Sequence, residues 1–145
     1  MPSAMTGYEQ ARNDTDLQSI DEIRAAHVAA LNSGDAQAWA ALFTYDAVQM
    51  PPNSPENIGR PNIISWSQAF LDQFCVHFAL AVDEVHVTSD WAFERGSYTI
   101  SLTSKAGGPL MQDIGKYVTI YQRDLEVGWR MARDIWNSNN PPPAL

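Results

Sequence analysis

The chain of 145 residues has a single cysteine, Cys75, and only nine basic side chains against seventeen acidic ones. One cysteine excludes an intramolecular disulfide and a cluster of thiolate metal ligands. The formal net charge of -8 disfavours binding to nucleic acid phosphates and to anionic membrane surfaces. No apolar run approaches the ~20 residues of a membrane-spanning helix, and the N-terminus lacks the order of a signal peptide. We therefore expect a cytoplasmic protein that binds neither nucleic acid nor membranes.

The composition is that of an ordinary globular protein. Hydrophobic residues make up 45% of the chain and charged residues 18%, which is too apolar for a disordered protein. The length lies near the usual size of one domain. Polar, aperiodic residues at the start and successive prolines at the end predict tails. We therefore expect one domain over residues 16–138, a flexible tail over 1–15 and a proline-rich tail over 139–145.

Helical periodicity marks three segments in the first half of the chain. They cover residues 16–33, for which Asp16 is the expected N-cap, then 36–43 and 62–73. A short strand over residues 45–50 is expected between the second and third helices, since two prolines halt it. The first half of the chain therefore has the order helix, helix, strand, helix.

Four longer segments with alternating apolar residues follow the helices. They cover residues 78–87, 91–103, 113–123 and 128–136. In the first of these segments the apolar phase slips by one residue between Val82 and Val85, which predicts a β-bulge. Helices followed by such strands are typical of an α+β fold, in which a curved, mostly antiparallel sheet wraps around three N-terminal helices. The curvature leaves a pocket between the sheet and the helices.

Two titratable side chains lie on faces that are expected to point inward. His27 lies on the apolar face of the first helix, where an imidazole is either a pocket donor and acid or base, or a core residue bonded to a backbone carbonyl. Glu94 shares a strand face with Ala92 and Tyr98, so it either enters the pocket or pairs with an arginine at the sheet edge. Both are candidate catalytic residues.

Asp134 is the third candidate catalytic residue. It alternates with Trp136 on one strand face, while Arg133 lies on the other face, so one of the two charged residues must point inward. The alternative is a structural ion pair between Asp134 and Lys116 on the neighbouring strand. Lys116 is in turn either a ligand for an anionic substrate group or a solvated strand lysine.

The expected pocket is lined by large apolar side chains that suit a flat apolar ligand. These candidate ligand-binding residues, each of which can equally be plain core, are Met50, Trp66, Phe70, Tyr98 and Trp136. The three histidines stand on different elements, and no paired-histidine or clustered-carboxylate motif is present. We therefore predict no metal site and no cofactor.

Several segments resemble one known family. They are Val28 to Asp35, Asp46 to Val48, Ile58 to Pro61, and the last strand from Gly128 to Asn137. In these segments the chain resembles the nuclear transport factor 2-like superfamily, which includes ketosteroid isomerases and SnoaL-like polyketide cyclases. The resemblance spans about residues 17–138 and implies a cone-shaped α+β fold. It says little about activity, because this fold supports isomerases, cyclases, epoxide hydrolases, dehydratases and domains without chemistry.

The resemblance also shows where this chain departs from the familiar enzymes. His27 stands where ketosteroid isomerases have a tyrosine that donates to the oxyanion, and it can still donate. Pro51 stands at the position of their general-base aspartate, so steroid isomerisation by that route is not expected. Asn137 stands where SnoaL-like cyclases have an aspartate base; its amide can bind a carbonyl but cannot accept a proton.

Two hypotheses about function follow. The first is a cofactor-free acid/base enzyme of the isomerase, cyclase or lyase type that acts on an apolar or aromatic carbonyl compound. The second is a non-catalytic ligand-binding or dimerisation domain. A homodimer through the convex sheet face is also expected, because Trp91, Phe93, Tyr117 and Tyr121 are assigned to that face.

Overall fold

The computed structural model describes residues 5–141, and within them an α+β fold is formed as predicted. The helices are α1 (Gly7–Ser33), α2 (Ala36–Ala40) and α3 (Arg60–Gln73). The strands are β1 (Phe43–Met50), β2 (Asn57–Ile58), β3 (Phe74–Thr88), β4 (Trp91–Ser104), β5 (Met111–Asp124) and β6 (Gly128–Ser138). The sequence pattern missed only the two-residue β2, which is too short to show alternation. The outermost parts of both expected tails, residues 1–4 and 142–145, lie outside the described residues.

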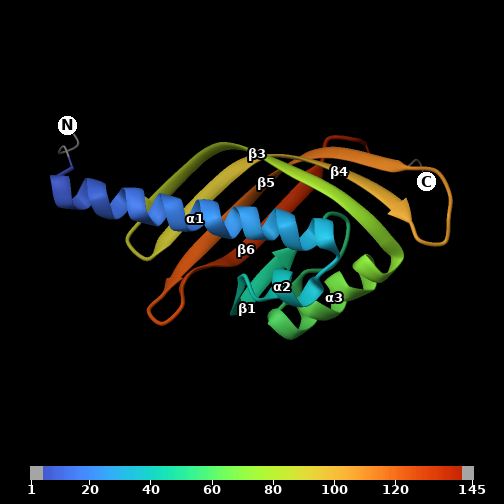
Figure 1. Ribbon diagram of the computed structural model, residues 1–145, viewed down its shortest axis with the longest axis horizontal. Helices are drawn as coiled ribbons and strands as arrows, with labels where there is room; N and C mark the ends of the chain where they lie inside the picture. Colours follow the sequence, from blue (N-terminus) through green and yellow to red (C-terminus); the bar gives the residue numbers. More distant parts are fainter. Residues whose placement is uncertain (1–4, 142–145) are drawn as a thin grey trace.

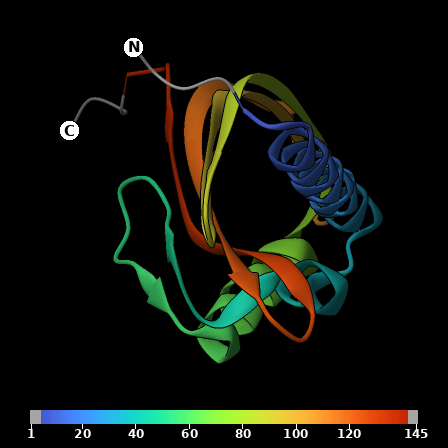
Figure 2. The same cartoon turned by 90° about the vertical axis from the view of Figure 1, so that its left-hand side faces the viewer.

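The strands form a six-stranded sheet in the order β2-β1-β6-β5-β4-β3. Its strand pairs are antiparallel except β1 with β6, which run parallel. The predicted β-bulge is confirmed, since the register of β3 against β4 shifts between Val82 and Glu84. Bulges of this kind bend a strand. Figures 1 and 2 show the result, a strongly curved sheet with α1 lying across one side and with α2 and α3 at one end.

Helix α1 begins ten residues earlier than predicted. Its N-cap is Thr6, whose hydroxyl accepts a hydrogen bond from the Glu9 amide, while the Glu9 carboxylate accepts one from the Thr6 amide. This capping box was present in the sequence and outweighs the polar character of the first turns. The prediction of Asp16 as N-cap is therefore wrong. Asp16 is instead buried within the helix and accepts hydrogen bonds from Arg123 at 2.7 and 2.8 Å and from Trp129 at 3.1 Å.

The register of β4 against β5 corrects the assignment of two tyrosines. Tyr117 lies opposite Gly96 and Tyr121 opposite Ala92, and directly opposed residues share a face of the sheet. Gly96 and Ala92 are buried on the inner face, so Tyr117 and Tyr121 are buried as well rather than on the convex face. Trp91 and Phe93 do lie outside, with exposed fractions of 43% and 42%. Without the register, alternation alone cannot say which face of β5 points inward.

The core lies between the concave face of the sheet and the helices. Its buried apolar members include Ile20 and Ile23 of α1, Trp39 of α2, Phe43 of β1, Ile63 of α3 and Met131 of β6. In the described residues no helix is both long enough and apolar enough to cross a membrane. The core fills one end of the concave face, and an open cavity occupies the other.

Candidate functional site

A cavity of about 300 Å³ lies between the concave face of the sheet and the helices. Most of its lining is apolar, with Trp66 and Phe70 from α3, Phe78 and Leu80 from β3, and Trp136 from β6. The polar side chains that line it are His27, Ser54, Tyr98, Asp113, Tyr117 and Asp134. A few polar groups in an apolar cavity are typical of a small-molecule site.

Asp134 is a carboxyl group of the cavity whose pKa lies far above its ordinary value. It lies on β6 opposite Thr119 of β5, whose hydroxyl donates to Asp134 Oδ1 at 3.3 Å. Burial raises the pKa of Asp134 from 3.8 to about 7; the bond from Thr119 lowers it in part, and the nearby charge of Glu94 adds to the rise. Both protonation states are therefore populated near neutral pH, so this carboxyl group can accept or donate a proton.

The alternative role for Asp134, an ion pair with Lys116, is not formed. Lys116 is exposed on the outer face of β5, where its Nζ donates to Asn139 Oδ1 at 2.9 Å. Asp134, by contrast, is only 5% exposed and lines the cavity. Of the pair Arg133 and Asp134, the aspartate is the one that points inward.

His27 reaches the cavity from α1. Its imidazole is 7% exposed, stacks on Phe78 with ring centroids 5.4 Å apart, and lies 5.8 Å from the Trp39 ring. Burial lowers the pKa of His27 to about 4, so the ring is neutral and carries one N–H donor. Its packing is aromatic, and the backbone carbonyl partner of the alternative interpretation is not found among the described residues.

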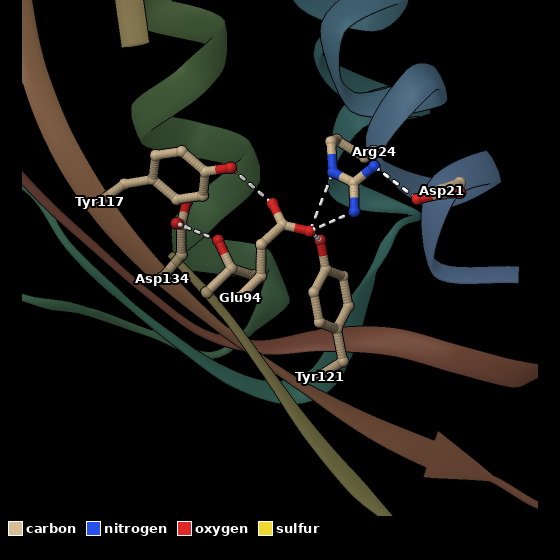
Figure 3. Close-up of polar contacts among 7 residues, drawn as sticks. Asp21, Arg24, Glu94, Tyr117, Tyr121 and Asp134 are labelled. Carbon is tan, nitrogen blue, oxygen red and sulfur yellow. Dashed lines mark hydrogen bonds and ion pairs between the residues drawn. The ribbon is translucent and has the colours of Figure 1, made fainter. Parts of the chain in front are cut away.

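Glu94 does not line the cavity; it accepts a hydrogen bond from Tyr117, which does. Three side chains converge on its fully buried carboxylate, as Figure 3 shows. Arg24 of α1 donates from both Nε, at 2.9 Å, and Nη2, while Tyr117 and Tyr121 donate at 2.6 and 3.2 Å. Glu94 is therefore paired with an arginine, as one of the two alternatives had it, and does not enter the pocket. The pair is buried, however, and does not lie at a sheet edge.

Three predicted ligand-binding residues lie outside the cavity. Lys116 and Asn137 are opposed in the register of β5 against β6 and are both exposed on the outer face. Strict alternation explains this, because their neighbours Tyr117 and Trp136 point inward. Met50 is half-buried and is likewise absent from the lining, since its neighbour Gln49 takes the inner face of β1. The placement of these three residues in a pocket is therefore corrected.

The other predicted wall residues do line the cavity. Trp66 stacks on Phe70 with a centroid distance of 5.8 Å and meets the edge of Trp136 at 6.2 Å. Tyr98 lies on the neighbouring part of the wall, 6.5 Å from Phe78. Together these rings form an aromatic wall that suits an apolar or aromatic ligand.

The sequence patterns singled out neither Asp113 nor Arg24. Asp113 lines the cavity and accepts a hydrogen bond from Tyr98 at 2.9 Å. Arg24 carries the charge that compensates Glu94, 70 residues away in the chain. A signal that could have pointed to Asp113 is the pattern of acidic residue, glycine and tyrosine at alternate positions, which occurs on both β4 and β5. Within residues 5–141 no group of three or more His, Cys, Asp or Glu side chains is placed to hold a metal ion.

Comparison with known structures defines the class of protein. A ketosteroid isomerase-like protein from Erwinia carotovora atroseptica is 24% identical, with a TM-score of 0.79 over 87% of this chain and 98% of the other. A nuclear transport factor 2-like superfamily protein from Salmonella enterica is 15% identical, with a TM-score of 0.78 over 90% of this chain and 95% of the other. The fold is therefore that of the nuclear transport factor 2-like superfamily.

The family follows from the sequence itself. Residues 24–124 match the SnoaL-like domain family, and the chain therefore belongs to that family. A candidate dehydratase of the nuclear transport factor 2-like family from Streptomyces avermitilis has the same fold, at 18% identity and a TM-score of 0.77 over 88% of this chain and 99% of the other. No match was found among curated protein sequences.

Proposed function

We propose that this protein is an acid/base enzyme of the isomerase, cyclase or lyase type, which acts without a cofactor on an apolar or aromatic carbonyl compound. The observation that carries the proposal is Asp134, a buried carboxyl group with a pKa of about 7 in the wall of an apolar cavity. A general acid or base works best when its pKa lies near the working pH. Burial of a carboxyl group without a cation has a cost in stability, which is typical of functional sites.

The chemistry assigned to Asp134 is proton transfer at carbon. Its carboxylate takes a proton from the carbon next to the substrate carbonyl, and the electron pair of the broken C–H bond forms an enolate. The neutral His27 ring donates its N–H to the oxygen on which the negative charge develops. The protonated Asp134 then returns the proton to the same or another carbon, or to a departing hydroxyl group, which is what an isomerase or a lyase requires.

The Trp39 indole packs beside His27 but offers the substrate no accessible donor. It lines the cavity beside His27, and among the described residues its Nε1 is buried without a hydrogen-bond partner. Because this N–H has no accessible surface, a ligand oxygen cannot reach it, and His27 is the donor assigned to the substrate oxygen. Pro51 also lines the cavity and has no group that can take a proton, so the base comes from β6 and not from the end of β1.

The structural relatives support a small-molecule enzyme. Besides the candidate dehydratase from Streptomyces avermitilis, a candidate scytalone dehydratase from Novosphingobium aromaticivorans shares the fold at 16% identity, with a TM-score of 0.77 over 90% of this chain and 89% of the other. Dehydration beside a carbonyl begins with the proton removal assigned here to Asp134. The second hypothesis, a non-catalytic ligand-binding domain, would use the same aromatic wall without proton transfer.

Proton exchange in heavy water separates the two hypotheses without knowledge of the natural substrate. The probe is 2-tetralone, an aromatic ketone with exchangeable protons beside its carbonyl, followed by proton NMR at pH 7. We expect the wild-type protein to accelerate exchange above buffer and Asp134→Asn to lose about 10²-fold or more of that acceleration. Asp72→Asn on the outer side of α3 is the matched control and should exchange like wild type. No acceleration by wild type would favour the non-catalytic hypothesis.

A further inference from the structure

Strands β4 and β5 carry the same five-residue pattern in opposite directions. The pattern of acidic residue, glycine and tyrosine at alternate positions is formed by Glu94, Gly96 and Tyr98 on β4 and by Asp113, Gly115 and Tyr117 on β5. In the antiparallel register each tyrosine lies opposite the glycine of the other strand. The two copies are thus related by the local two-fold symmetry of the strand pair.

Each tyrosine ring lies across the opposing glycine. A Cβ atom at Gly115 would stand 2.4 Å from the Tyr98 ring, and one at Gly96 would stand 3.0 Å from the Tyr117 ring. Each hydroxyl then reaches the acidic residue of the neighbouring strand, at 2.6 Å from Tyr117 to Glu94 and at 2.9 Å from Tyr98 to Asp113. A Cβ atom at either position would also stand 2.2 Å from a backbone carbonyl oxygen of the next strand, that of Ala81 at Gly96 and that of Asn137 at Gly115, so both positions require glycine.

The two copies differ in how the carboxylate charge is compensated. Glu94 receives the Arg24 guanidinium in addition to its tyrosines. Asp113 receives only neutral donors, namely Tyr98, the Ser138 hydroxyl and the Asn140 amide. No ion pair of the described residues includes Asp113, and no lysine or arginine lines the cavity.

We infer that Tyr98 and Asp113 form a specificity site that binds a hydrogen-bond donor of the ligand, a hydroxyl or ammonium group. Both residues line the cavity, whereas Glu94 and Arg24 do not. The Tyr98 hydroxyl already donates to Asp113, so its free lone pair can only accept. Asp113 Oδ2 has one partner and can accept a further donor.

This inference rests on the proposed function and narrows its substrate class. The substrate would be an aromatic carbonyl compound that also carries a hydroxyl or amino group. Tyr98 lies over Gly115, four residues along β5 from Thr119, which opposes Asp134. Four residues span roughly 13 Å of strand, so the two polar groups of the substrate would lie at opposite ends. An anionic substrate is disfavoured, because both carboxylates of the cavity would repel it.

Binding of three naphthalene probes, measured by calorimetry at pH 7, tests this specificity site. They are 2-naphthol, which donates a hydrogen bond, 2-methoxynaphthalene, which cannot donate, and the anion 2-naphthoate. We expect wild type to bind 2-naphthol about fivefold or more tightly than 2-methoxynaphthalene, as one buried hydrogen bond provides, and to bind 2-naphthoate most weakly. Equal affinity for the first two probes, tighter binding of the anion, or no binding of any probe would overturn the inference.

Variants of Tyr98 and Asp113 test whether these two residues cause the preference for 2-naphthol over 2-methoxynaphthalene. Asp113→Ala and Tyr98→Phe should each reduce the ratio of the two dissociation constants, and Asp113→Ala should also improve binding of 2-naphthoate. Asp72→Ala and the exposed Tyr45→Phe are the matched controls and should keep the wild-type ratio. Should Asp113→Ala fail to fold, Asp113→Leu, which branches at the same carbon but has no hydrogen-bond acceptor, replaces it. An unchanged ratio in Tyr98→Phe and either Asp113 variant would overturn the inference.

Failure of this inference is distinguishable from failure of the proposed function. The probe ratio reports on Tyr98 and Asp113 and requires no reaction, whereas exchange of 2-tetralone protons reports on Asp134. If the protein prefers 2-naphthol but does not accelerate proton exchange in 2-tetralone, only the proposed enzyme activity is contradicted. Exchange by wild type without a donor preference would contradict the specificity site alone.

Discussion

Removal of Arg24 should be among the most destabilising single changes in this protein. Glu94 is fully buried, and Arg24 is its only cationic partner among the described residues, contacting it through Nε at 2.9 Å and through Nη2. Breaking a buried ion pair by removal of one partner typically costs 3–5 kcal/mol. Because Tyr117 and Tyr121 still donate to the carboxylate, we expect Arg24→Met to cost about 3 kcal/mol. For a domain of this length that lowers Tm by roughly 10 °C.

A double-mutant cycle in urea separates the charge from the packing. Glu94→Gln keeps the volume of the side chain but removes its charge, so the double variant should be less destabilised than the sum of the two single variants by at least about 1 kcal/mol. The matched control is the exposed pair Arg95 and Glu84, joined at 2.7 Å, where solvent screens the charges; Arg95→Met should cost far less stability than Arg24→Met. If Arg24→Met costs no more than Arg95→Met, or if the cycle is additive, the buried charge pair is not what stabilises this part of the fold.

Three further predictions concern His27, the reaction and the assembly. The pKa of His27 is about 4 in the folded protein and 6.5 in the unfolded chain, so between pH 4 and 6.5 the unfolded state binds more protons. The stability that the neutral His27 contributes is therefore lost as the pH falls from 6.5 to 4. The free energy of unfolding of wild type minus that of His27→Gln, measured in urea, should therefore rise from pH 4 to 6.5 and then level off; a constant difference would show a charged or exposed ring. Purified protein should not isomerise a 5-ene-3-ketosteroid at an enzyme-like rate, because Pro51 replaces the base of the steroid isomerases and Asp134 reaches the cavity from a different strand, β6; rapid turnover in an absorbance assay would show that Asp134 can take over that role. We also propose a homodimer through the outer sheet face that carries Trp91 and Phe93, which Phe93→Glu should dissociate; light scattering that gives a mass near 16.1 kDa for wild type would contradict it.

Periodicity was sufficient to predict the architecture. The bulge in β3 was visible as a slip of one residue in the apolar alternation, and it is this bulge that bends the sheet. His27 and Asp134 were found because each lies at a regular spacing from buried neighbours on its own element. Such predictions use only local sequence, and local sequence determines which residues of one element share a face.

Contacts between distant elements could not be predicted in this way. Tyr117 was assigned to the wrong face because alternation gives two equivalent choices, and only the pairing of Tyr117 with Gly96 decides between them. Pairing with an arginine was one of two alternatives for Glu94, and the sequence did not say which arginine. Arg24 lies on the polar side of a helix in the sequence pattern and reaches Glu94 only once α1 packs on the sheet. The pKa of Asp134 depends likewise on burial by all of the elements around it.

The most direct test of the account is the titration of the Asp134 carboxyl group itself. In protein with ¹³C-labelled aspartate, the Asp134 resonance is assigned by its absence from the Asp134→Asn variant, and its chemical shift is followed from pH 3 to 9. We predict a midpoint near pH 7, because burial in the cavity wall raises the pKa to about 7. A midpoint near the ordinary value of 3.8 would show a solvated, permanently ionised carboxylate and would contradict the assignment of Asp134 as the acid/base group.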